Sequence, residues 1–206
     1  MILVHHLNNS RSQRVLWLLE ELELTYDLRR YERDPVTNLA PSELASVHPL
    51  GKSPVIEIDG RKIAESGAIV DYLCHQHGRH MLPRAGSDEY ITHMELLHFA
   101  EGSAMVPILL QLYTARLGNN AAPLRPRIDQ QLDSHFAYME SMLRPSGHFV
   151  LDELSAADIM LSFPAEIAVK QDRGALYPGL ARFVETIHAR RAWKRAMERG
   201  GAYSFA

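Results

Sequence analysis

The hydrophobic and polar positions of the first 80 residues alternate between strand-like and helix-like patterns. Residues 1–7 form an apolar run rich in β-formers, which predicts a strand. Residues 8–10 favour a turn or a helix cap, and the apolar positions from 15 to 22 have the i, i+3, i+4, i+7 spacing of an amphipathic helix. Residues 26–31 then alternate as a second strand would. We therefore expect a β-α-β unit with parallel strands and a right-handed crossover.

A second set of strand and helix patterns lies between residues 41 and 78. Residues 41–48 predict a short helix that Pro49 ends, and residues 55–58 predict a strand. Asp59-Gly60 is a strong hairpin signal, so residues 61–64 are the expected returning strand. A helix is then expected to begin at Glu65 and Ser66. The first 78 residues thus predict a small mixed sheet with helices, in the order β-α-β and then β-β-α.

From residue 88 onward the patterns are almost only helical. Helical periodicity covers residues 87–117, with a kink expected at Pro107, and residues 124–143, 155–169 and 178–199. The Gly and Pro residues just before this part indicate a linker. We therefore expect an α/β domain at residues 1–78, a linker at residues 79–87 and an all-helical domain at residues 88–206.

Composition and charge narrow the class of protein. The chain has 206 residues, 46% of them hydrophobic, which suffices for a core without disulfide or metal staples. Its one cysteine, Cys74, allows no intramolecular disulfide and no cysteine-rich zinc site, which fits a reducing compartment. The net charge of −3 argues against a nucleic-acid partner. No apolar run reaches the ~18 residues of a membrane helix and no secretory signal is seen, so we expect a soluble, cytoplasmic protein without a membrane partner.

Four motifs resemble those of the soluble glutathione transferases, and they occur in that family's order. Residues 10–21, Ser-Arg-Ser-Gln-Arg-Val-Leu-Trp-Leu-Leu-Glu-Glu, resemble its active loop and first helix. Residues 48–60 resemble the segment around its cis-proline, residues 65–73 resemble its third helix, and Ser155-Ala-Ala-Asp158 resembles a capping box in its helical domain. The resemblance implies a thioredoxin-like domain followed by an all-helical acceptor-substrate domain. It also implies that glutathione is a co-substrate.

The opening loop most resembles a bacterial and fungal serine-type subgroup with the pattern Ser-Arg-Ser-x-Arg. Serine-type members bind the substrate thiol with a hydroxyl of this loop, which implies that Ser10 donates a hydrogen bond to the glutathione thiolate. Ser12 is an equally capable donor two residues away, and the Asn9 amide is a third candidate. Without the resemblance, Ser10 is explained as a helix cap or turn residue. Tyrosine- and cysteine-type sites are not expected, because residues 1–25 contain neither residue type.

The resemblance also implies binding residues for the rest of glutathione. It implies a cis bond before Pro54, with Ser53 offering its backbone to the cysteinyl part. Lys52 is a candidate partner for the glycyl carboxylate, and a solvated loop lysine is as consistent with its position. At the expected helix start, the backbone N–H groups and hydroxyl of Ser66 would bind the γ-glutamyl carboxylate, and Glu65 would pair with the ammonium group.

Further polar residues receive more general roles. Glu101 is a candidate contact to the same ammonium group across a homodimer, because the family places acidic residues there. Ser155 and Asp158 are expected to cap a helix, with Leu154 and Ile159 as a hydrophobic staple.

The histidines raise the question of a metal site. Residues 75, 77 and 80 cluster, and His5 and His6 are adjacent. Residues spaced by two at a helix end point in different directions, so we expect a solvated linker at residues 75–80 and no metal.

Three functions are open at this point. The first is conjugation, in which the glutathione thiolate attacks a small hydrophobic electrophile, as in detoxification. The second is a glutathione-dependent peroxidase or disulfide reductase. The third is a non-catalytic glutathione-transferase-like binding module, since fold alone does not settle function. Glutathione binding is favoured because Ser10, Lys52, Pro54, Glu65 and Ser66 are present together.

Overall fold

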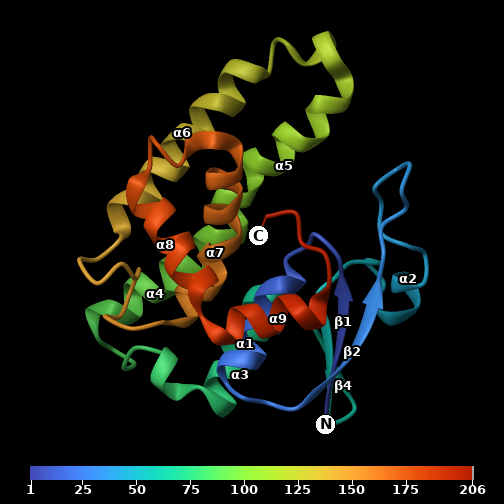
Figure 1. Cartoon of the computed structure of the whole chain (residues 1–206), viewed down its shortest axis with the longest axis vertical. Coiled ribbons are helices and arrows are strands. Elements are labelled where there is room, and N and C mark those ends of the chain that lie inside the picture. Colours follow the sequence, from blue (N-terminus) through green and yellow to red (C-terminus); the bar gives the residue numbers. More distant parts are fainter. Residues whose placement is uncertain (206) are drawn as a thin grey trace. The chain divides into compact units, whose positions relative to one another are not determined.

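The structure, a computed structural model, describes residues 1–205, and for residue 172 it describes the backbone alone. Within this range the chain forms two compact units (Figure 1). Unit 1 contains residues 1–80 together with the C-terminal segment from Thr186 onward, and unit 2 contains residues 81–185. All the candidate site residues named above fall in unit 1, apart from Glu101.

Unit 1 contains a four-stranded sheet with the strand order β2-β1-β3-β4. Strand β1 (Ile2–Leu7) pairs in parallel with β2 (Tyr26–Tyr31) and antiparallel with β3 (Val55–Ile58), and β3 pairs antiparallel with β4 (Arg61–Ala64). The turn between β3 and β4 uses Asp59 and Gly60 at φ 50° and 76°, the left-handed conformation that a tight hairpin requires. The predicted β-α-β unit and hairpin are both confirmed.

The helices of unit 1 support the loop that carries Ser10. They are α1 (Ser12–Glu21), α2 (Leu44–Val47), α3 (Ser66–His77) and α9 (Arg191–Gly200), with a short 3-10 turn, η1, at Arg79–Met81. Helix α1 is buried over nearly its whole length, because it packs against β1, α3 and α9. Helix α2 belongs to a separate apolar cluster that consists of Leu7, Tyr31, Leu44, Val47 and Val55. Helix α1 therefore begins from a packed base, directly after the loop that carries Ser10.

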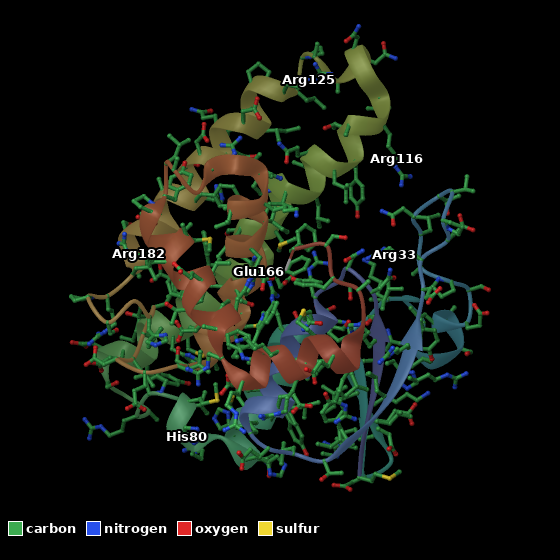
Figure 2. The ribbon with its side chains drawn as sticks, viewed as in Figure 1. Arg33, His80, Arg116, Arg125, Glu166 and Arg182 are labelled. Carbon is green, nitrogen blue, oxygen red and sulfur yellow. The ribbon has the colours of Figure 1, made fainter. Side chains whose placement is uncertain are left out.

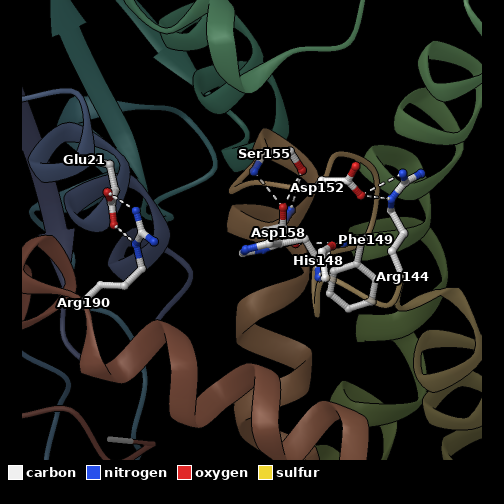
Figure 3. A network of polar contacts seen from close by, with 9 residues as sticks. Glu21, Arg144, His148, Phe149, Asp152, Ser155, Asp158 and Arg190 are labelled. Atoms are coloured by element: carbon white, nitrogen blue, oxygen red, sulfur yellow. Dashed lines mark hydrogen bonds and ion pairs between the residues drawn. The ribbon is translucent and has the colours of Figure 1, made fainter.

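Helix α9 lies beside α1 (Figure 1), so the C-terminal segment groups differently from the expected domain of residues 88–206. Glu20 of α1 is 9% exposed, and its carboxylate accepts hydrogen bonds from Arg195 at 2.7 Å and from the Tyr26 hydroxyl at 2.9 Å. Glu21 pairs with Arg190 at 2.6 Å (Figure 3). These ion pairs, together with apolar packing, attach the end of the chain to unit 1.

The expected single helix at residues 178–199 is two helices, α8 (Pro178–Ala189) and α9. They are separated by Arg190, whose backbone is extended at φ −66° and ψ 139°. A residue in this conformation cannot continue an α-helix. The helical periodicity on both sides was predicted correctly, and the one-residue break between them was not.

Unit 2 is helical, as the sequence predicts. Its helices are α4 (Asp88–Phe99), α5 (Met105–Thr114), α6 (Arg125–Met142), α7 (Ala156–Ala168) and the part of α8 up to Glu185, joined by the irregular turns η2 (Ala100–Ala104), η3 (Ala115–Ala121) and η4 (Val169–Arg173). The irregularity expected at Pro107 is the π turn η2 just before it. That turn contains Ser103, whose carbonyl a non-proline residue at 107 would have bonded.

One helical stretch of unit 2 passes a length and composition test for a membrane span. The stretch Asp88–Ala121 has 34 residues, and the mean hydropathy of its most apolar window is 1.2. A third (33%) of that window is buried, and core helices of soluble proteins pass the same test. One such stretch is weak support for a membrane span, so the absence of a membrane partner stays a prediction.

The start of α7 has the predicted capping box (Figure 3). The Ser155 hydroxyl accepts the Asp158 N–H at 3.4 Å, and the Asp158 carboxylate accepts the Ser155 N–H at 2.7 Å. Asp158 also accepts the Phe149 N–H at 3.0 Å, which ties the preceding loop to the helix. Leu154 and Ile159, the expected staple pair, are both buried. The structural role predicted for Ser155 and Asp158 is confirmed.

Candidate functional site

The loop between β1 and α1, residues 8–11, is called the serine loop. It places Ser10 just beyond the carboxyl end of β1. The Ser10 Oγ lies 2.8 Å from both the Leu7 carbonyl oxygen and the Ser12 Oγ, and it accepts the Ser12 N–H at 3.2 Å. The N-cap position of α1 is Arg11, without a side-chain cap among the described residues, so Ser10 is a turn residue just before the helix whose oxygen accepts the first helical N–H. This contact uses a lone pair of the Ser10 oxygen. It leaves the hydroxyl proton for another acceptor.

Ser12 is fully buried and contacts His6. Its Oγ lies 2.7 Å from the His6 Nδ1. Burial, assisted by the nearby charge of Arg30, lowers the pKa of His6 from 6.5 to about 4, so the ring is neutral at neutral pH. The ring also hydrogen-bonds to the backbone of Gly200, which lies next to Nε2. A neutral ring has one N–H, and a carbonyl acceptor at Gly200 fixes it on Nε2, so we assign Nδ1 as the acceptor and Ser12 as the donor to it.

The two serines therefore differ in what their protons can do. The Ser12 Oγ lies 2.7 Å from the His6 Nδ1 and 3.1 Å from the Leu7 carbonyl oxygen, and we assign its proton to the nearer acceptor, His6. The Ser10 proton is shared between neutral oxygen acceptors, and Ser10 is the more exposed of the two, at 7% against 0%. A negatively charged acceptor near the loop would compete well for the Ser10 proton, because hydrogen bonds to ionised groups are the stronger ones. The geometry favours Ser10 over Ser12 as a donor to a bound anion.

The segment before β3 meets the same part of β1. The Ser53–Pro54 peptide bond is cis, as the resemblance implied. The Ser53 hydroxyl donates to the His5 carbonyl at 2.8 Å and accepts the Leu7 N–H at 3.1 Å. Ser53 and Ser10 thus bind the N–H and the C=O of one residue, Leu7. The cis-proline segment and the serine loop are in this way adjacent at the end of β1.

The start of α3 brings the next pair of expected residues together. Ser66 is buried, and its hydroxyl lies 3.4 Å from the Arg14 guanidinium of α1. Glu65 is exposed and has a left-handed backbone at φ 67°, which is costly for a residue with a side chain. No described side chain caps this helix start, so its first N–H groups suit an anionic ligand. Lys52 is exposed, and within residues 1–205 it makes no hydrogen bond or ion pair.

Asn9 and Glu101 have different surroundings. Asn9 is left-handed at φ 49°, and its side-chain oxygen accepts the backbone N–H of Ser204 at 2.8 Å. The tail after α9 is therefore fastened to the serine loop within unit 1. Glu101 lies in unit 2, in the π turn η2, and its contact to glutathione across a dimer stays a prediction.

The two histidines of β1 have partners that the sequence analysis did not assign. His5 and His6 are buried, at 2% and 3% exposed, and are not solvated. His5 lies 2.8 Å from the Tyr31 hydroxyl and 2.9 Å from the Glu57 carboxylate, while His6 points to the serine loop. Side chains alternate along a strand, so the predicted strand already places His5 and His6 on opposite faces of the sheet. This alternation could have indicated from the sequence that the two histidines have separate surroundings. The histidines at 75, 77 and 80 are exposed, and no group of three metal-ligating side chains occurs in the described part of the chain.

Cys74 is excluded as a reactive group of this site. It is fully buried in α3, and burial raises the pKa of its thiol to about 12. A thiol in that state is neutral and a poor nucleophile at neutral pH. The one cysteine of the chain therefore offers no reactive thiol to this site.

The fold and the site together define a two-domain, thioredoxin-like class of protein. Its features here are a mixed four-stranded sheet, a serine loop, a cis-proline before β3 and a separate helical unit. Two family models match the chain: the N-terminal domain of glutathione S-transferase over residues 1–75, and its C-terminal domain over residues 98–191.

Individual relatives agree with the family models. Glutathione S-transferase 1 of Saccharomyces cerevisiae is 30% identical and covers 98% of this chain and 96% of its own length. Glutathione S-transferase 3 of Schizosaccharomyces pombe is 29% identical and covers 97% and 88%. A glutathione S-transferase from Actinobacillus pleuropneumoniae, known from a crystal structure, is 32% identical in sequence. Its structure superposes on this one with a TM-score of 0.89, and the match covers 100% of this chain and 95% of that chain. The chain belongs to the glutathione S-transferase family, and we conclude that it is a glutathione transferase.

Proposed function

We propose that this transferase joins the thiolate of glutathione to small hydrophobic electrophiles and that the hydroxyl of Ser10 donates a hydrogen bond to that thiolate. The proposal rests on one observation above all: within the described residues, the Ser10 oxygen accepts the Ser12 N–H and its hydroxyl proton is shared between neutral oxygen acceptors. On this basis the enzyme belongs to the serine-type subgroup. Ser12, the other candidate, supports the loop through His6.

The size of the pKa shift that a hydrogen bond can cause agrees with this role for Ser10. A free thiol has a pKa of about 8.5, so only a small fraction is thiolate at neutral pH. A hydrogen bond to a charged group contributes about 1.5–3 kcal/mol, which lowers the pKa by roughly one to two units. The start of α1 acts in the same direction, because a helix N-terminus favours negative charge. Together the two effects make the thiolate the dominant form of bound glutathione at neutral pH.

The remaining residues would hold glutathione from its two ends. The start of α3, with Ser66, would take the γ-glutamyl carboxylate, and Glu65 would pair with the ammonium group. The backbone of Ser53, before cis-Pro54, would pair with the cysteinyl part, and Lys52 would meet the glycyl carboxylate. These groups lie on segments that meet α1 or the end of β1, which supports one continuous binding surface in unit 1.

A glutathione-dependent peroxidase or disulfide reductase is the second candidate. A serine site can serve either reaction, because glutathione carries the reactive sulfur. The burial of Cys74 argues against a mechanism through a protein thiol. We favour conjugation because the relatives are named transferases. We also expect a homodimer in the cytoplasm, which is typical of the family.

Binding and turnover experiments test the proposal in turn. The protein should be retained on immobilised glutathione and gain thermal stability with it, and failure of both would exclude a glutathione enzyme. Rates with a chromogenic aryl halide should then exceed rates with cumene hydroperoxide. A reversed order would assign the site to peroxide reduction. Ser12→Ala should keep more aryl-halide activity than Ser10→Ala, since only Ser10 is proposed to meet the sulfur.

A further inference from the structure

Arg33 lies two residues beyond β2, and its guanidinium contacts the serine loop (residue labelled in Figure 2). Its Nε donates to the Asn8 carbonyl at 3.2 Å and its Nη2 to the Asn9 carbonyl at 3.2 Å. Its Nη1 donates to the Asn38 carbonyl at 3.1 Å, and its backbone N–H donates to the Asn8 side-chain oxygen at 3.1 Å. One guanidinium thus holds two successive peptide units of the loop, and a third from the segment after β2.

The backbone conformation explains how one side chain reaches two successive carbonyls. In an extended strand, successive carbonyls point to opposite sides. Asn9 is left-handed at φ 49°, which turns the carbonyls of Asn8 and Asn9 to the same side. Both peptide bonds are trans, so each N–H points opposite to its carbonyl. The N–H groups of Asn9 and Ser10 therefore both point away from Arg33.

These two N–H groups have no hydrogen bond among residues 1–205. Successive N–H groups on one side of a turn form a concave donor pair that suits an anion. Ser10 contributes both its N–H and its hydroxyl to this place in the loop. The loop thus offers a charged atom more donors than the hydroxyl alone.

We propose that Arg33 is a positioning residue of the thiol site: it holds the loop so that the N–H groups of Asn9 and Ser10 face the glutathione sulfur beside the Ser10 hydroxyl. This inference rests on the proposed role of Ser10. Arg33 itself binds backbone carbonyls on the other side of these peptides and does not meet the sulfur. Its guanidinium is suited to the task, because its planar fork of donors serves several carbonyls at once, which a lysine ammonium on a flexible stem does not.

Charge-preserving and charge-removing variants of Arg33 separate positioning from simple charge. Arg33→Lys keeps the positive charge and loses the fork, and Arg33→Met loses both. If Arg33 positions the loop, both variants raise the pKa of the bound glutathione thiol by about one unit. The smaller thiolate fraction then lowers kcat at neutral pH about three- to fivefold, with KM for glutathione changed less than about threefold. The control is Arg61→Lys, an exposed residue of β4, which should leave all three quantities unchanged.

The outcomes distinguish this inference from the proposed function. The thiol pKa is read from the ultraviolet absorbance of the thiolate, and Ser10→Ala is titrated beside the Arg33 variants. A raised pKa in Ser10→Ala with a wild-type pKa in Arg33→Lys would overturn the role of Arg33 alone. A wild-type pKa in Ser10→Ala would overturn the proposed role of Ser10. A defect in Arg33→Met that Arg33→Lys fully restores would assign Arg33 a charge effect and overturn positioning.

A measurement on the unaltered protein tests the same inference without any variant, so it does not depend on whether the variants fold. The Ser10 amide proton is followed by NMR while glutathione or S-methylglutathione is added. If the N–H meets the thiolate, its resonance moves downfield with glutathione and much less with the S-methyl compound, which has no thiolate. Equal shifts with both compounds would overturn the inference.

Discussion

Ser10 and Ser12 lie two residues apart, and their hydrogen-bond partners separate them chemically. Ser12 donates to the neutral ring of His6, and that ring keeps its own proton on the side of Gly200. Among the described residues, Ser10 pairs with oxygen acceptors and with the Ser12 N–H. At the scale of single residues, the proposed mechanism therefore gives the two hydroxyls different roles: Ser12 donates to the buried His6, and Ser10 donates to the ligand.

The neutral state of His6 predicts a pH dependence of stability. Its pKa is about 4 in the folded chain and 6.5 when unfolded, so between these values only the unfolded state takes up the proton. The stabilisation is present above pH 6.5 and is lost as the pH falls toward 4. His6→Gln keeps an amide donor for Gly200 and removes the titration. Between about pH 7 and pH 5, urea unfolding of the wild type should lose about 2 kcal/mol more than that of the variant.

An equal loss in both proteins would contradict the assignment of a buried neutral ring. The histidines at 75, 77 and 80 are exposed, so their substitution serves as the control. A variant such as His77→Gln should follow the wild-type pH dependence.

At the scale of elements, the attachment of α9 to α1 centres on Glu20. The carboxylate meets Arg195, Arg199 and the hydroxyl of Tyr26, and the Arg199 guanidinium also lies 3.7 Å from the centre of the Tyr26 ring. Burial and the Glu20 hydrogen bond both raise the pKa of Tyr26, so the phenol stays protonated as a donor. Loss of Glu20 would leave this hydroxyl without its acceptor and both arginines without their shared anion.

Glu20→Ala is expected to lower the free energy of unfolding by about 2 kcal/mol, since a partly buried network loses its central acceptor. Because this network attaches α9, limited proteolysis should also cut the chain more readily after residue 190. Glu32→Ala is the matched control, because Glu32 is exposed and makes no hydrogen bond or ion pair within the described residues. Equal stability of the two variants would show that the network does not hold α9.

The sequence predicted those features that depend on neighbouring residues. The alternation of β1, the spacing of apolar residues in α1 and the Asp59-Gly60 turn each specify their element locally, and the motifs around Pro54 and Ser66 identified the family. It did not predict that α9 packs in unit 1, because Glu20 and Arg195 lie far apart in the chain and no local period links them. The contacts of Arg33 were missed for a related reason. Its partners are backbone carbonyls, which leave no trace in the residue types of the loop.

At the scale of the whole molecule, unit 2 leaves apolar side chains exposed on α4 and α5. Ile91, Met94, Val106, Leu110 and Tyr113 are exposed by more than a third. Such side chains are consistent with a surface that another chain covers, as the proposed homodimer requires. Sedimentation equilibrium should give about twice the 23.3 kDa mass of one chain. A mass equal to one chain across the concentration range would contradict the homodimer.

The role of Ser10 is tested most directly by the pKa of the glutathione thiol bound to three proteins: wild type, Ser10→Ala and Ser12→Ala. Thiolate absorbance is followed against pH at saturating glutathione. The wild type should hold the thiol roughly one to two pKa units below the value of about 8.5 for a free thiol, and Ser10→Ala should return it most of the way. Ser12→Ala should shift it less. A bound thiol whose pKa is the same in Ser10→Ala as in the wild type would contradict the proposed mechanism.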